Sequence, residues 1–455
     1  MRELTKSMIG LPWALSMFGV QQAANLMAPP SAKRMGDTAD AFDAVSHAAE
    51  QGFDGWMLKT YKMGDGLQRA MVDAMFLKPP SIDASALMRA ASEMQGSPLF
   101  QFGLQYVLPP VAWADSFLVS GKDSSATLQE FTNKLYVIQL VAQVETRLGL
   151  DKAGDTPLTD LVARAETLDT FARLWAIEGL GNYYAERSWD RTPGTDPHDL
   201  LTDPSTADLP SSSLTMLHAG IGMSFANRLL RNLGSAPSPG AVREAVVRFA
   251  GLCRGSSRPG YAGAALESLG LATRTLYPEF VALVDRELPA VDPSLVGYFW
   301  HGVGRAVYFD PTTLLPSFNA PWRSIAKLAH DTPDEHAHFN ALSGFSWAVT
   351  VVNMRTPEVM EAVLRHHGTT LAQSPAFTNG VSSVLMMRYD TTPDDSHLQP
   401  FLAHEPSMAD PTVVAAWNTL ITQPGTDALN RTYPALLRAS RLEELFHYVP
   451  ASAEG

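Results

Sequence analysis

The chain has 455 residues, of which 45% are hydrophobic and 18% are charged. This length and apolar content suffice for a large folded core, and they exclude a small disulfide scaffold and a wholly disordered chain. The net charge of -13 provides no basic surface for a phosphate backbone, so the sequence argues against a nucleic-acid partner.

Residues 1–125 are predicted to form a helical region of their own. Apolar residues recur at three- and four-residue steps between residues 38 and 76, which indicates amphipathic helices. Their polar faces are not rich in lysine or arginine, so packing within the protein is favoured over contact with a membrane surface. The most hydrophobic stretch, residues 8–20, is too short to span a bilayer.

Residues 126–455 carry a helical pattern almost throughout. The pattern predicts a long helix over 128–148, a proline-rich loop over 190–213, and further helices over 241–253, 322–330 and 357–366. The single cysteine, Cys253, lies among apolar and small residues and is predicted to be a buried thiol. One cysteine cannot form an internal disulfide, which favours a cytoplasmic location.

Six segments within this region repeat one short pattern. Each has a polar or small residue, a glycine, an apolar or small residue, then Gly, Ala or Ser, and an apolar helical tail. The first glycines of these segments are 36 to 43 residues apart: Gly179, Gly220, Gly263, Gly302, Gly344 and Gly380. A period near forty residues is typical of one helical hairpin, so we expect an all-α fold, either a helical-repeat superhelix or an α/α-toroid.

The glycines themselves require an explanation, because each one inside a helix costs up to ~1 kcal/mol relative to alanine. A face of Gly, Ala and Ser permits close approach of another group. Two interpretations are open: a neighbouring helix packs against the small residues, or a flat ligand lies in a groove that they line.

The order and wording of the six segments resemble a protein family of unknown function that is encoded beside enediyne polyketide synthase gene clusters. The similar pieces are EGLGNYYAERSW from Glu178, TMLHAGIGMSFANRLL from Thr215, GYAGAALESLGLATR from Gly260, WHGVGRAVYF from Trp300, LSGFSWAV from Leu342 and TNGVSSVLMMR from Thr378. Coverage runs from about residue 170 to 390. The resemblance implies a setting in specialised metabolism of polyketide or other lipid-like chains. It implies no catalytic residues, because the family has none assigned.

Polar residues beside the repeated glycines are the candidate site. If the glycine helices surround one hollow, these residues converge on it, as in a pocket for a mostly hydrophobic molecule. The candidate catalytic residues, chosen as groups for acid–base chemistry, are His301, His218 and Glu178. The candidate substrate-binding residues are Arg305, Ser343 and Asn379.

A metal site is a weaker candidate. Glu335 with His338, and Glu444 with His447, have the Glu-x-x-His spacing that puts a carboxylate and an imidazole on one helix face. Di-iron bundles use two such pairs with further glutamates. Chance alone supplies about one such pair in a chain with this many acids and histidines, and no cofactor is assigned.

Three functions follow from these observations. The first is an accessory protein or enzyme of specialised metabolism that binds a hydrophobic small molecule on the glycine-rich helix face. The second is an α-solenoid scaffold that binds a partner protein along its concave surface. The third is a metal-dependent, di-iron-like oxidoreductase.

Overall fold

The computed structural model describes residues 123–150, 156–309, 321–406 and 410–450. Within these ranges the regular elements are helices and none is a strand, so the predicted all-α class is confirmed. The amphipathic helices expected in residues 1–125 lie outside the described residues, apart from the start of the helix α7. The repeat superhelix or toroid stays a prediction.

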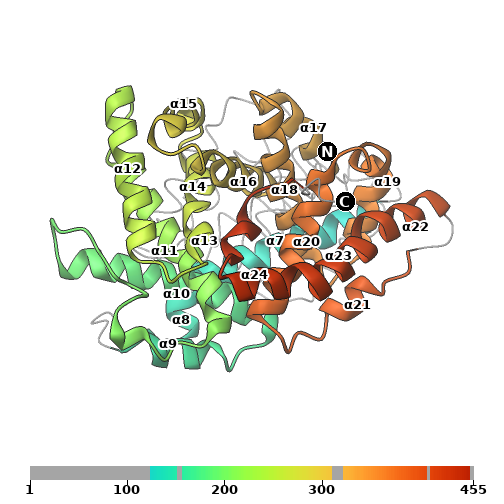
Figure 1. Ribbon diagram of the computed structural model, residues 1–455. Helices are drawn as coiled ribbons and strands as arrows, with labels where there is room; N and C mark the ends of the chain where they lie inside the picture. The colour runs from blue at the N-terminus through green and yellow to red at the C-terminus, as the bar shows by residue number, and fades with distance from the viewer. Residues whose placement is uncertain (1–122, 151–155, 310–320, 407–409, 451–455) are drawn as a thin grey trace, which may run out of the picture.

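The helices follow one another through the whole described chain (Figure 1). In the first half they are α7 (Ser124–Ala142), α8 (Val144–Arg147), α9 (Leu158–Ala165), α10 (Thr170–Arg191), η3 (Pro204–Thr206), α11 (Ser211–Arg231), α12 (Pro239–Gly255), α13 (Ala262–Leu266), α14 (Ser268–Leu276), η4 (Pro278–Phe280) and α15 (Val281–Val291). In the second half they are α16 (Leu295–Tyr308), α17 (Pro321–Asp331), α18 (Glu335–Asn353), α19 (Glu358–Leu371), α20 (Pro375–Thr391), α21 (Leu398–Leu402), α22 (Pro411–Trp417), η6 (Asn418–Thr422), α23 (Gln423–Asp427), η7 (Ala428–Thr432), α24 (Tyr433–Ala439) and η8 (Leu442–Phe446).

Capping residues fix where several of these helices begin. The side chains of Asp169, Ser238, Asp334, Ser374 and Asp410 each accept a hydrogen bond from backbone N–H groups in the first turn that follows. Such caps satisfy donors that the helix cannot pair internally, and each stabilises a helix by about 1 kcal/mol. The sequence therefore sets these boundaries locally.

Six inner elements pack in chain order, each against the next: α10, α11, the α13–α14 pair, α16, α18 and α20. Neighbours run parallel. Ser224 and Arg228 of α11 contact Glu186 and Asp190 of α10, respectively, so the two helices advance together. The helices α12, α15, α17 and α19 pack outside them, and α7 lies against α10, α18 and α19. Of the C-terminal helices in Figure 1, α22 packs against α19, and α23 packs against α20 together with η6 and η7.

The first glycines of most segments face the preceding helix. A Cβ at Gly220, Gly344 or Gly380 would lie about 2 Å from a carbonyl oxygen there, at 1.9, 1.9 and 2.1 Å respectively. Those oxygens belong to Glu178, His301 and Ser343, the candidate residues of the preceding segment.

The second glycines face the following helix instead. A Cβ at Gly181 or Gly222 would lie 2.3 Å from the carbonyl oxygen of Leu217 or Ala265. The pattern of two glycines therefore serves two neighbours, one on each side, and the helix-packing interpretation of these residues is confirmed. The small-residue face is filled by backbone, so the expectation that it lines a ligand groove is wrong for these glycines.

The buried apolar side chains form one continuous cluster that extends from α7 to η8. Cys253 on α12 belongs to it, with no exposed surface, and burial raises the pKa of its thiol. No helix in the described ranges combines the length and apolar character needed to cross a bilayer.

Candidate functional site

One face of α16 carries a series of functional groups. Gly297, His301, Arg305 and Tyr308 are spaced by three or four residues, which places them on one side of the helix. All four are buried. At the start of α16 this face adjoins a pocket, and farther along it enters the protein interior, where the charged groups find partners on other helices.

Glu267, at the junction between α13 and α14, joins two of these groups. One of its carboxylate oxygens lies 2.5 Å from Nδ1 of His301, and the other accepts a hydrogen bond of 2.6 Å from Nη1 of Arg305. Glu178 of α10 lies 3.7 Å from Nη2 of Arg305. These four residues, two acids and two bases from three inner elements, form what we call the buried charge cluster.

The two acids of the buried charge cluster respond differently to their surroundings. Burial pulls the pKa of Glu267 upward, but Arg305 and His301 outweigh burial and hold the pKa below its ordinary value. Burial raises the pKa of Glu178, and the more distant Arg305 opposes this only in part. Glu267 is therefore the permanent anion of the cluster.

Two nitrogen atoms in the cluster have no hydrogen-bond partner among the residues that the structure describes: Nε2 of His301 and Nε of Arg305. The guanidinium of Arg305 lies over the ring of Trp347, at 4.3 Å from its centroid. Because a carboxylate oxygen accepts hydrogen bonds, Nδ1 of His301 is the donor toward Glu267, and Nε2 is the nitrogen that points away from it. Chemically, this pair is a carboxylate-supported base.

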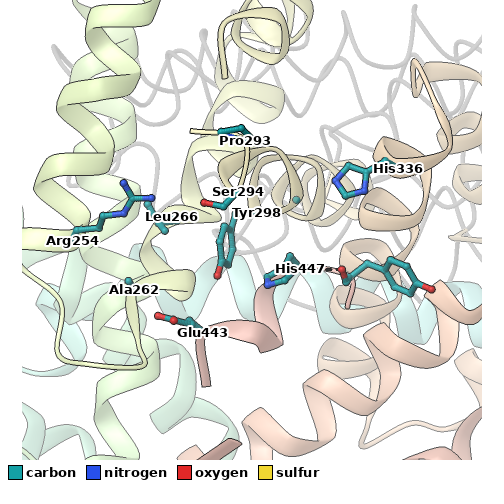
Figure 2. Close-up of a pocket in the computed structure, with 11 residues that line it drawn as sticks. Arg254, Ala262, Leu266, Pro293, Ser294, Tyr298, His336, Glu443 and His447 are labelled. Atoms are coloured by element: carbon teal, nitrogen blue, oxygen red, sulfur yellow. Dashed lines mark hydrogen bonds between the residues drawn. The ribbon is translucent and has the colours of Figure 1, made fainter. Parts of the chain in front are cut away.

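The pocket beside the start of α16 has a volume of about 570 Å³. Its polar lining comes from Arg254, Ser294, Tyr298, His336, Glu443 and His447, and its other lining residues are Ala262, Leu266, Pro293, Gly297 and Tyr448. Figure 2 shows Tyr298 and His447 next to each other, with Glu443 and Arg254 on one side and His336 on the other. Three parts of the chain, α12–α13, α16–α18 and η8, thus meet around one concavity.

His447 and Tyr298 are both uncharged at neutral pH. Their rings meet edge to face with centroids 4.7 Å apart. Burial, helped by the nearby His301 and His336, lowers the pKa of His447 to about 4. Burial, with help from Glu443, raises the pKa of Tyr298 well above its usual range. The pocket therefore offers neutral hydrogen-bonding groups beside apolar surface.

The structure brings together some of the residues selected from the sequence and separates others. His301, Arg305 and Glu178 lie in the buried charge cluster. Ser343 donates a hydrogen bond of 2.9 Å to Asn379, so these two form a pair of their own between α18 and α20.

His218 is held by backbone groups on both sides of its ring. Nδ1 lies 2.6 Å from the carbonyl oxygen of Leu214, and Nε2 accepts a hydrogen bond of 3.1 Å from the N–H of Arg258. The ring stacks on Tyr261, and burial lowers its pKa to about 4. A neutral imidazole with both nitrogens occupied connects helix α11 to the loop before α13.

The Glu-x-x-His pairs do not form a metal centre in the described part of the chain, where no group of three or more His, Cys, Asp or Glu side chains could hold an ion. Glu335 is exposed, and Nδ1 of His338 lies 3.4 Å from the hydroxyl of Thr332. Glu444 pairs with Arg441, while His447 faces the pocket.

Sequence reasoning missed Glu267 and most of the pocket. Glu267 lies five residues after Ala262, the residue that precedes the first glycine of its segment, so alignment on the glycines leaves it out. Glu267 lies four residues after Gly263, so the sequence already places it on the same helix face as that glycine. Tyr298, Glu443 and His336 carried no signal, because the pocket arises from packing between distant segments.

Comparisons with known proteins return nothing: no family model, no curated protein and no solved structure matches this chain.

Proposed function

We propose that this chain binds a largely hydrophobic small molecule in the pocket beside α16, as an accessory protein or enzyme of specialised metabolism. The observation that carries the proposal is the pocket itself, about 570 Å³, in which the neutral Tyr298 and His447 lie among apolar residues, with Arg254 and Glu443 also in the lining. Pockets of 300–1,000 Å³ with a few fixed polar groups are typical of small-molecule sites. The metabolic setting rests on the resemblance of the six segments to the enediyne-associated family.

The chemistry of the pocket supports acid–base assistance by His447 rather than direct contact with His301. His301 and Glu267 have no exposed surface, whereas His447 lines the pocket. A neutral His447 can accept a proton or hydrogen bond from a hydroxyl group of the ligand.

A blocking variant tests the proposal. Ser294 is exposed at the pocket edge, so Ser294→Trp should fill the space without disturbing the core. We expect aromatic fragments, screened by ligand-observed NMR, to bind the wild-type chain and to lose at least tenfold in affinity for this variant. The matched control is Ser235→Trp on an exposed loop between α11 and α12, which should bind as the wild type does. A screen in which no fragment distinguishes the two variants would refute the proposal.

Two alternative functions, a scaffold for a partner protein and a metal-dependent oxidoreductase, have less support from the described residues. In the described ranges the exposed large hydrophobic side chains are Val247, Tyr389 and Leu437, which are few for a protein-binding face. A metal-dependent reaction would require ligands from outside those ranges, given the absence of a suitable cluster within them.

A further inference from the structure

Three arginines meet where the start of α10, the turn between α18 and α19, and the end of α20 come together. They are Arg173, Arg355 and Arg388, and the charges of Arg173 and Arg355 act on Arg388. This place lies at the far end of the inner helices from the pocket. The pocket is at the start of α16, Arg355 follows the end of α18, and these two helices run parallel, with Gly297 near Asn340 and Tyr308 bonded to Asn353.

Each of the three guanidinium groups has hydrogen-bond donors that find no acceptor within the described ranges. Nη2 of Arg388 pairs with Asp395, but its buried Nη1 has no partner. Arg173 pairs through Nη2 with Asp394, while its buried Nε has none. No hydrogen bond links Arg355 to any residue that the structure describes. An unpaired buried donor costs about 1–3 kcal/mol, and more if charged, so the two buried donors of Arg173 and Arg388, beside a third arginine without an acceptor, require an explanation.

Arg355 is held in position although it has no acceptor. Its guanidinium carbon lies 3.7 Å from the centroid of the Phe171 ring and 5.6 Å from that of Tyr136. A guanidinium stacked on a ring keeps its N–H edge available for an anion. Burial lowers the pKa of Arg355, and Asp169 and Asp395 oppose this. Arg355 is thus a preorganised and only partly buried cation.

The nearby carboxylates differ in how firmly they are held. Asp395 is 1% exposed and also accepts hydrogen bonds from the backbone of His397 and from Thr170. Asp169 is used as the cap of α10, where it accepts from two backbone N–H groups. Asp394, by contrast, is 61% exposed and contacts Arg173 alone. An exposed carboxylate with a single partner is held weakly and can be displaced.

We propose that the three arginines form a binding site for a tetrahedral oxyanion, the phosphate group of a small molecule, and that Asp394 occupies part of it when the site is empty. The guanidinium groups approach from three separate elements. Three directions of approach suit an anion with oxygens on several sides, whereas a planar carboxylate is satisfied by the fork of one arginine. With a net charge of -13 the chain has no general attraction for anions, so binding must come from this local arrangement.

Titration of the full-length chain with inorganic phosphate at pH 7.5, followed by calorimetry, tests the proposal. We expect saturable binding to one site. Arg355→Met should weaken binding at least tenfold, because it removes the cation that has no internal partner. Asp394→Asn should strengthen binding several-fold, because it removes the competing carboxylate. The matched control is Arg248→Met, which breaks a comparable surface pair with Asp196 and should bind as the wild type does.

Several results would overturn the proposal. These are an absence of saturable phosphate binding in both the wild type and Asp394→Asn, equal phosphate affinity in Arg355→Met, and acetate binding as tight as phosphate binding. Circular dichroism of each variant checks that it is folded. The pocket-blocking variant Ser294→Trp should leave phosphate affinity unchanged, which separates this site from the proposed function.

Discussion

Glu267 shows how a single side chain can organise a protein interior. One of its oxygens lies beside His301 and the other accepts a hydrogen bond from Arg305, and these two residues stand one turn apart on α16. The acid lies between α13 and α14, so it fastens this pair of helices to their neighbour. A buried cluster of charges stabilises the fold only when all its members are present, because the loss of one member leaves the others charged and unpaired.

Glu267→Gln is predicted to destabilise the fold by about 3–5 kcal/mol, since it preserves the volume and removes the charge. Urea unfolding measured by circular dichroism gives the change in free energy. Glu186→Gln is the matched control, because Glu186 is also bonded to an arginine, Arg228, but is a third exposed. We expect about 1 kcal/mol or less there. Equal losses for the two variants would contradict the role given to Glu267.

At this scale the sequence allowed a partial prediction. The position beside a glycine selected His301, Glu178 and Arg305 as candidate site residues, and the three do lie together in the structure. The same rule also selected His218, whose ring is occupied by the backbone of Leu214 and Arg258. Position on a helix face is visible in a sequence, but hydrogen bonds from a loop forty residues away are not.

Among the elements, the paired glycines are the feature that sets helix spacing. In α10, α11 and α16 the second glycine meets the backbone of the following helix, and in α11, α16, α18 and α20 the first glycine meets the backbone of the preceding element, at distances that a methyl group would prevent. Close packing between the helices offsets the lower helix propensity of glycine, which explains why the pattern recurs along the chain.

Gly344→Ala is predicted to destabilise the fold by about 3 kcal/mol or more, because its Cβ would lie 1.9 Å from the carbonyl oxygen of His301 and force α16 and α18 apart. Gly251→Ala in the middle of α12 serves as the control. It meets no atom within 4 Å, so the better helix former should be neutral or stabilising by up to ~1 kcal/mol. Urea denaturation of both variants provides the comparison, and a tolerated Gly344→Ala would show that the helices can separate freely.

Several helices were predictable from periodicity alone. The expected segments 241–253, 322–330 and 357–366 correspond to α12, α17 and α19, each of which extends a few residues further. The segment 128–148 was expected as one helix, but it is divided at Gln143 into α7 and α8. Apolar periodicity continues through such a break because both pieces bury the same side, so the sequence does not reveal it.

On the scale of the whole molecule, the change in folding stability with falling pH is the sum of opposing contributions from different buried groups. A carboxylate with a raised pKa, such as Glu178, favours the fold as the pH falls. A buried histidine with a lowered pKa acts in the other direction. His218 has a pKa of about 4 in the fold against 6.5 ordinarily, so its contribution is complete above pH 6.5 and is lost as the pH falls toward 4.

His218→Gln is therefore predicted to flatten the pH dependence of stability. The difference between wild type and variant isolates this residue, since other groups cancel. We expect the wild type to lose up to about 3 kcal/mol more than the variant between pH 7 and pH 4, seen as a larger fall in thermal midpoint. His198→Gln, at a side chain that is 78% exposed, should follow the wild type. Parallel curves for all three proteins would rule out a neutral, buried His218.

The pocket depends on a segment that comes late in the chain. Residues Glu443, His447 and Tyr448 form part of its lining, while its other walls belong to α12 through α18. On the ribosome, those walls are complete long before the closing piece emerges. A nascent polypeptide can thus fold most of its helices and still lack a binding cavity, and occupancy by a ligand would report that translation has passed residue 448.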